Sequence, residues 1–75
     1  MMKKQSYRFL YRADDVLVLA TLPITSGSAD RYAKATAKEI AKAGGYGEVY
    51  LIWQGPAEEG IPAEIMEALR RERAS

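Results

Sequence analysis

The chain has 75 residues, which suits one small domain, and its 11 basic and 10 acidic side chains leave a net charge of +1. The absence of cysteine and histidine from the sequence excludes disulfides and metal sites built on thiolate or imidazole ligands. The balanced charge is atypical of a strongly basic nucleic-acid binder, and the lack of a long apolar run or a signal-peptide core predicts a cytoplasmic protein without membrane contact.

The first predicted strand covers residues 7–12 and follows a tail formed by residues 1–5. Aromatic residues alternate in it with arginine and leucine, which is the period-two pattern of a strand with one aromatic face. The aromatic positions are Tyr7, Phe9 and Tyr11. A short acidic turn leads into a second strand, residues 16–22, so the two strands should form an antiparallel hairpin. Pro23 is expected to end the second strand because it has no N–H for a ladder hydrogen bond.

Residues 16–53 carry the organising pattern of the chain: an apolar run, a small polar loop, a helical segment, a Gly-Gly turn and a second apolar run. This pattern is typical of two parallel strands joined by a crossover helix. The helix should begin near Ser28, whose hydroxyl can cap the first turn, and should end where Gly44 or Gly45 takes a left-handed conformation. Its small apolar side consists of Ala29, Ala33, Ala37 and Ile40. Its opposite side is a basic stripe that consists of Arg31, Lys34, Lys38 and Lys42.

A third strand, residues 48–53, and a loop, residues 54–60, precede the last helix, which should start at Pro62. The predicted fold is therefore a single α+β domain, residues 1–75, with the element order β-β-α-β-α. We expect two layers: a three-stranded mixed sheet and two helices that share one of its faces.

The second and third strands are apolar on both of their faces. The pattern runs from Val16 to Leu22 in one strand and from Val49 to Trp53 in the other. Strands of this kind are normally covered on both sides, whereas the predicted two-layer fold covers only one. Because so short a chain also has a marginal core, we expect a homodimer or a heterologous protein partner to cover the open face.

The loop between the second strand and the helix is a candidate site for a small anion or nucleotide. Backbone N–H groups at a helix N-terminus attract anions, and ligands of open α/β sheets favour the carboxyl ends of the strands. The side chains available at that end are Thr25, Ser26, Ser28, Trp53 and Gln54. A capped turn is the simpler interpretation, because the loop lacks the glycine and lysine pattern of phosphate-binding loops.

The basic stripe is the sharpest electrostatic feature of the sequence. It could contact a phosphate backbone or an acidic protein surface, and the simpler alternative is a solvated helix face. The aromatic face of the first strand could stack single-stranded bases, with Arg8 and Arg12 nearby. These arginines lie on the opposite face of that strand, however, so we expect the aromatic residues to belong to the core.

The sequence predicts a binding protein and not an enzyme, because it lacks histidine and cysteine and places no serine or lysine in a nucleophile context. No cofactor and no metal are expected. The first hypothesis is a small module that acts through protein–protein contacts, such as an inhibitor or accessory protein of a larger host complex encoded by a phage or mobile element. The alternatives are a nucleic-acid-binding domain that uses the basic stripe and a small anion- or nucleotide-binding domain.

Overall fold

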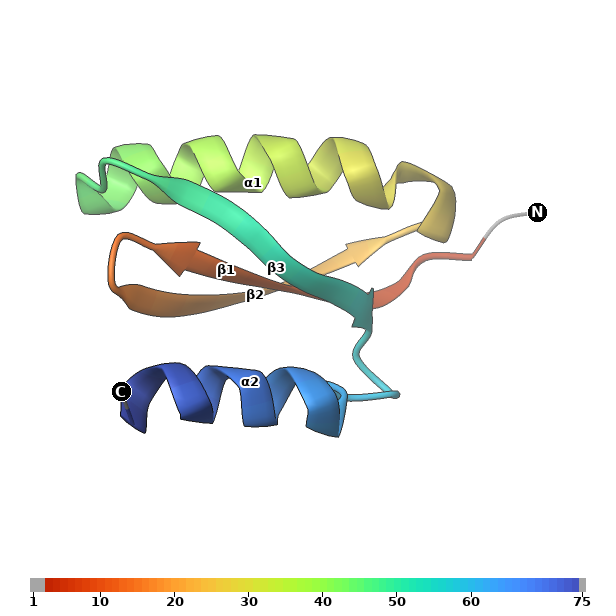
Figure 1. Cartoon of the computed structure of the whole chain (residues 1–75). Helices are drawn as coiled ribbons and strands as arrows, with labels where there is room; N and C mark the ends of the chain where they lie inside the picture. The colour runs from red at the N-terminus through yellow and green to blue at the C-terminus, as the bar shows by residue number, and fades with distance from the viewer. Residues whose placement is uncertain (1–2, 75) are drawn as a thin grey trace.

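The computed structural model describes residues 3–74 and has the predicted element order β-β-α-β-α (Figure 1). A short 3-10 turn, η1, precedes the first helix. The elements are β1 (Gln5–Ala13), β2 (Val16–Ile24), η1 (Ser26–Ser28), α1 (Ala29–Gly44), β3 (Val49–Pro56) and α2 (Ala63–Ala74). None of the described helices combines the length and the apolar character needed to cross a membrane.

The sheet has the strand order β2-β1-β3, and β1 is antiparallel to both of its neighbours. The predicted mixed sheet is therefore wrong: the sheet is entirely antiparallel. Because β2 and β3 both oppose β1, they run in the same direction, as expected for strands joined by a crossover helix. They do not pair, because the N-terminal strand β1 lies between them.

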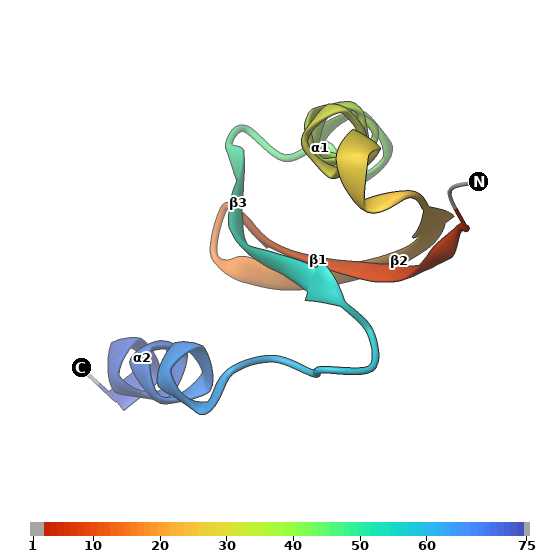
Figure 2. The ribbon, with the colours of Figure 1, turned by 90° about the vertical axis from the view of Figure 1, so that its right-hand side faces the viewer.

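The two helices lie on opposite faces of the sheet, so the prediction that both share one face is also wrong (Figures 1 and 2). The segment between β3 and α2 carries the chain to the face that α1 leaves free. This arrangement places one helix on each side of the sheet, and α2 lies on the side of β3.

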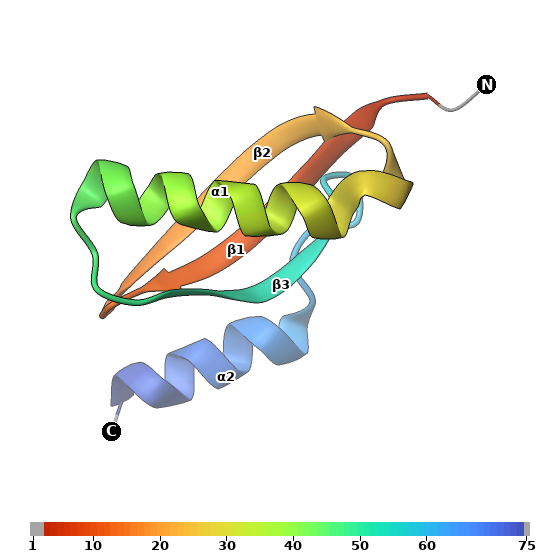
Figure 3. The same cartoon turned by 90° about the horizontal axis from the view of Figure 1, so that it is seen from above.

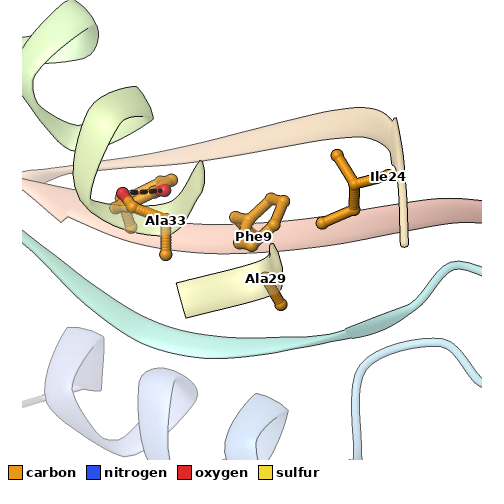
Figure 4. Close-up of a cluster of buried hydrophobic side chains, with 5 residues drawn as sticks. Phe9, Ile24, Ala29 and Ala33 are labelled. Atoms are coloured by element: carbon orange, nitrogen blue, oxygen red, sulfur yellow. Dashed lines mark hydrogen bonds between the residues drawn. The ribbon is translucent and has the colours of Figure 1, made fainter. Parts of the chain in front are cut away.

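The core lies between α1 and the central strand β1. Two of its side chains, Phe9 and Tyr11, are completely buried, and they stack with ring centroids 6.5 Å apart. Figure 4 shows Phe9 facing Ile24, Ala29 and Ala33, which close the cluster. The alanines let α1 approach the sheet closely, and the Tyr11 hydroxyl donates a 2.7 Å hydrogen bond to the Ala33 carbonyl. The prediction that the aromatic face of the first strand is buried is confirmed for Phe9 and Tyr11, and Tyr7 is partly buried against the same cluster.

Strand β1 begins earlier than predicted, at Gln5, and strands β2 and β3 end later than predicted. Pro23 does not end β2, which continues to Ile24, because Pro23 pairs with Ser6 at a position where no N–H to β1 is needed. The Ser6 carbonyl instead accepts a hydrogen bond from the Ala57 N–H on its other side. Strand β3 likewise continues to Pro56, so residues 54–56, predicted as loop, are strand.

Helix α1 begins and ends at the residues that the sequence predicts. Gly45 ends the helix with a φ of 68°, as predicted for Gly44 or Gly45. Ser28 precedes the helix as predicted, but its hydroxyl donates to the Thr25 carbonyl at 3.0 Å instead of capping the first turn. At the other end, the Asp14 carboxylate accepts hydrogen bonds from the backbone N–H groups of Gly47 and Glu48, which ties the β-hairpin turn to the start of β3.

Candidate functional site

The basic stripe lies on the outer side of α1, opposite the alanines that pack on the sheet. All four of its residues are exposed: Arg31, Lys34, Lys38 and Lys42. Arg31 lies over the ring of Tyr32, 5.5 Å from its centroid. Arg8 and Arg12 point away from the α1 side of the sheet, because they alternate in β1 with the aromatic core residues. The stripe and these two arginines therefore do not form one basic surface.

The residues of the predicted anion site are divided between two faces of the sheet. The Thr25 and Ser28 hydroxyls lie 2.8 Å apart and bond to each other, and Ser26 is exposed. Gln54 reaches the same end of α1, where its amide nitrogen donates to the Asp30 carboxylate at 3.1 Å. Trp53, the residue before Gln54, pairs with Leu10 on the α2 side of the sheet.

Charge also disfavours an anion at this helix end. The Asp30 carboxylate occupies the first turn of α1, where it would repel a bound phosphate. The Thr25 and Ser28 hydroxyls are already hydrogen-bonded, to each other and, for Ser28, to the Thr25 carbonyl. The loop is therefore a hydrogen-bonded turn and not a phosphate-binding loop.

The opposite side of the sheet carries an apolar groove between β2 and α2, here called the α2 groove. It has a volume of about 300 Å³ and is lined by Leu10, Leu17, Ile61, Met66, Leu69 and Arg70. Two further hollows on this side also touch Leu69, so α2 rests on the sheet through few contacts. Figures 2 and 3 show the cause: α2 lies below and beyond β3, which leaves β2 without a helix beneath it.

Large apolar side chains at and next to this groove are open to solvent. Leu17 is 39% exposed, Leu19 is 48% exposed and Met66 is 47% exposed. Leu17 and Met66 line the groove, and Leu19 continues the same face of β2, two residues further along the strand. An apolar surface of this kind on a small protein is typical of a contact site for another molecule.

The charged groups around the groove are of both signs: Arg70 lines the groove itself, and Asp15 and Glu72 line the adjoining hollow. Arg12 is already engaged, because its guanidinium forms an ion pair with Glu72. Arg8 lies on the same side of the sheet, and its enclosed Nε has no hydrogen-bond partner among the described residues. The groove therefore presents an apolar floor with a cation at its rim.

The sequence contained one signal for this groove. In the sequence, Ile61, Ile65, Ala68 and Leu69 recur at helical spacing with Met66 alongside, which gives the last helix an apolar side. Because both helices were assigned to one sheet face, that side was expected to be fully used against the core. Only the position of α2, beyond β3 and under the other face, leaves Met66 open beside Leu17.

A further hollow of about 390 Å³ lies between α1 and β3, where the helix carries the small side chains Ala33 and Ala37. Within residues 3–74, no group of three or more acidic, histidine or cysteine side chains is placed to hold a metal ion.

The chain matches no known family model, and neither the curated proteins nor the solved structures contain a significant match. Its function must therefore be inferred from its own surface.

Proposed function

We propose that this protein is a non-enzymatic module that binds a partner protein through the α2 groove. The observation that carries the proposal is the exposure of Leu17, Leu19 and Met66 in and beside an apolar groove. Isolated apolar residues are normal on a protein surface, but a contiguous group beside a hollow favours a contact with another chain. An inhibitor or accessory subunit of a larger complex would act through a surface of this kind.

The groove fits an amphipathic segment whose apolar side carries an acidic neighbour. Its floor is formed by aliphatic side chains, which suit the leucine-like anchors of a helix that docks in a groove. Arg70 at the rim would pair with a carboxylate of that segment, and such charge pairs contribute mainly to specificity and to the rate of association. The partner is therefore expected to present apolar residues flanked by glutamate or aspartate.

The proposal can be tested with two model peptides, one helical peptide of leucine and glutamate and one of leucine and lysine. Amide chemical shifts should change along Leu17, Met66 and Leu69 on titration with the acidic peptide. Met66→Glu should weaken this binding at least tenfold, because it places a charge in the apolar groove and next to the acidic peptide. Lys38→Glu, which introduces the same residue on the other side of the molecule, is the matched control.

Reversal of the rim charge makes the test sharper. Arg70→Glu should invert the preference, so that the lysine peptide binds better than the glutamate peptide. Shifts confined to α1, or an equal response of both peptides in parent and variant, would contradict docking in the α2 groove.

Nucleic-acid binding by the basic stripe is the second candidate function. Four exposed cations on one helix face support it, since phosphate contacts need little more than accessible positive charge. The net charge of +1 and the position of Arg8 and Arg12 on the other side of the sheet weigh against it. The division of the Thr25, Ser28 and Trp53 side chains between two faces weighs against the small-anion alternative.

A further inference from the structure

We propose that β2 forms the interface of a homodimer, in which it pairs antiparallel with β2 of a second copy about a two-fold axis at Leu19. The two sheets would then continue as one sheet through the interface. This inference concerns the backbone edge of β2, so it goes beyond the proposed partner. Leu17 belongs both to β2 and to the lining of the α2 groove. The two proposals are tested separately, because one predicts the mass of the protein in solution and the other predicts peptide binding.

The outer edge of β2 presents unpaired backbone groups. Residues of an antiparallel pair alternate between hydrogen-bonded and non-hydrogen-bonded positions. Ser6 turns its carbonyl toward Ala57, so the pair Ser6–Pro23 is a non-hydrogen-bonded one. Counting back by twos along the uninterrupted register, the N–H and C=O groups of Thr21, Leu19 and Leu17 point to the open edge.

The two edges of the sheet differ in their protection against pairing. Strand β3 carries a register shift opposite Leu10 and Tyr11, where Ile52 is the extra residue, and it ends in Pro56. A bulge of this kind hinders the pairing of an edge with another chain. Pro56 has a counterpart in Pro23 of β2, so the register shift is what distinguishes the two edges. Strand β2 keeps one register with β1 from Val16 to Ile24, and its sequence contains no charged residue. Edge β2 is therefore the edge that is open to another strand.

A second copy fits this edge because the strand is complementary to itself. A two-fold axis at Leu19 pairs Leu19 with its own copy and pairs Leu17 with Thr21 of the other chain. Every inter-strand hydrogen bond then forms twice, once from each chain, and no like charges meet across the axis. Pro23, whose missing N–H faces the same edge, lies at the end of the pairing, where it limits its length.

The exposed area of the chain agrees with a missing partner. A folded monomer of 8.3 kDa is expected to expose about 4,600 Å². This chain exposes 5598 Å², which is about 1,000 Å² more than that relation predicts. A standard interface buries about 800 Å² on each partner, so one interface of ordinary size would account for the excess. Pairing of β2 would also bring the exposed Leu17 and Leu19 side chains of both chains together.

The first experiment measures mass in solution by sedimentation at 10 to 100 micromolar chain, roughly the range in which a modest dimer is populated. The parent should have twice the chain mass of 8.3 kDa. Leu19→Lys should reduce it to one chain, because a charge on the open strand blocks pairing. Tyr50→Lys, at a similarly exposed position on the other edge strand, should remain a dimer. A parent of single-chain mass, or a Leu19→Lys variant that stays dimeric, would overturn the proposal.

The second experiment tests the axis and uses the natural absence of cysteine. Leu19→Cys places two thiols on a directly opposed pair, whose Cα atoms are about 5.5 Å apart and within disulfide range. Leu17→Cys is the matched control, because its two copies would be offset by about 13 Å along the strands. Mild oxidation should therefore cross-link the first variant at least tenfold faster. Equal rates would contradict the proposed pairing, and neither result bears on peptide binding in the α2 groove.

Discussion

Tyr11 shows how one side chain joins the sheet to α1. Its ring is completely buried, and its hydroxyl donates to the Ala33 carbonyl. Burial raises the pKa of the Tyr11 hydroxyl above its ordinary value of 10.0, and a side-chain hydrogen bond with Thr36 partly opposes this rise. The alternation of residues 7–12 predicted that Tyr11 is buried. It could not predict the partner of the hydroxyl, which depends on how α1 is rotated.

The raised pKa of Tyr11 predicts a loss of stability in alkali. The unfolded chain ionises this tyrosine near its ordinary pKa, while the folded chain keeps the proton to higher pH. The stabilisation is therefore complete below pH 10.0 and is lost as pH rises through the higher pKa of the folded state. Thermal unfolding followed by circular dichroism should show a melting temperature that falls above this pH.

Two variants separate this effect from general alkaline unfolding. Tyr11→Phe should lower stability at neutral pH by about 1 kcal/mol, the usual contribution of one hydrogen bond, and should flatten the alkaline fall. Tyr32→Phe, at a 39% exposed position, should keep the alkaline fall of the parent. If the melting temperature of Tyr11→Phe fell with pH as it does in the parent, another group would be responsible for the alkaline loss of stability.

Gly55 provides a second prediction at the scale of the residue. A Cβ at this buried position would lie 2.7 Å from Cζ2 of the Trp53 ring, closer than atoms can pack. Gly55→Ala should displace the ring and lower stability by about 1 to 3 kcal/mol, the usual range for overpacking. Because Trp53 is the single tryptophan, its fluorescence maximum reports the displacement directly. Gly27→Ala, where a Cβ meets nothing within 4 Å, should change neither property.

At the scale of the element, α2 differs from α1 in how firmly it is held. Helix α1 packs on β1 through the buried Ala29 and Ala33, whereas α2 contributes no residue to this core and three hollows are lined by its Leu69. The Arg12–Glu72 ion pair adds one polar contact to the described part of α2. Elements with few buried apolar contacts open locally at low free energy.

The rates of amide hydrogen exchange should therefore differ between the two helices. The amides of α2 should exchange much faster than those of α1 and β1, and Leu69→Ala should accelerate α2 without affecting β1. Phe9→Ala, which removes a completely buried ring, should instead destabilise the whole fold by about 3 to 5 kcal/mol. Protection of α2 equal to that of β1 would show that the helix is docked more firmly than its contacts indicate.

The elements themselves could be predicted from the sequence, but their layers could not. Alternation, apolar runs and the glycine at Gly45 determine the strands and α1, because these signals act within a few residues. The position of α2 depends on the path of residues 57–62 after β3, on which local periodicity has no influence. The apolar character of β2 on both faces did indicate missing cover. Helix α2 lies on this side of the sheet beyond β3, so it leaves Leu17 and Leu19 of β2 exposed.

The candidate site was predictable to a similar degree. The basic stripe could be identified because its spacing of three and four residues places it on one helix face, and its exposure follows from the alanines opposite. The α2 groove could not, since it lies between Leu17 and Met66, which are 49 residues apart and meet only through tertiary structure. The proposed anion site failed to assemble because Trp53 and Gln54 alternate across the sheet.

At the scale of the whole molecule, the two candidate surfaces face in opposite directions. Helices α1 and α2 lie on opposite sides of the sheet (Figure 2). The basic stripe lies on the outer side of α1, and the α2 groove lies between α2 and the opposite face of the sheet. The Cα radius of gyration is 13.0 Å, compared with about 11 Å expected for a domain of this length. A thin and extended molecule of this kind exposes both surfaces at once, so each can be altered without disturbing the other.

This separation leads to a prediction for the basic stripe. Replacing Lys34 and Lys38 with glutamate should change stability by about 0.5 kcal/mol or less, because both side chains are exposed and glutamate is an equally good helix former. Any binding of a short DNA duplex by the parent should weaken steeply with salt and should fall at least tenfold in the double variant. Dimer mass and binding of the acidic peptide should stay unchanged, because the groove and β2 lie elsewhere.

The same double change at Lys3 and Lys4 controls for net charge. If peptide affinity fell in the Lys34/Lys38 variant and not in this control, the stripe itself would belong to the protein-binding surface.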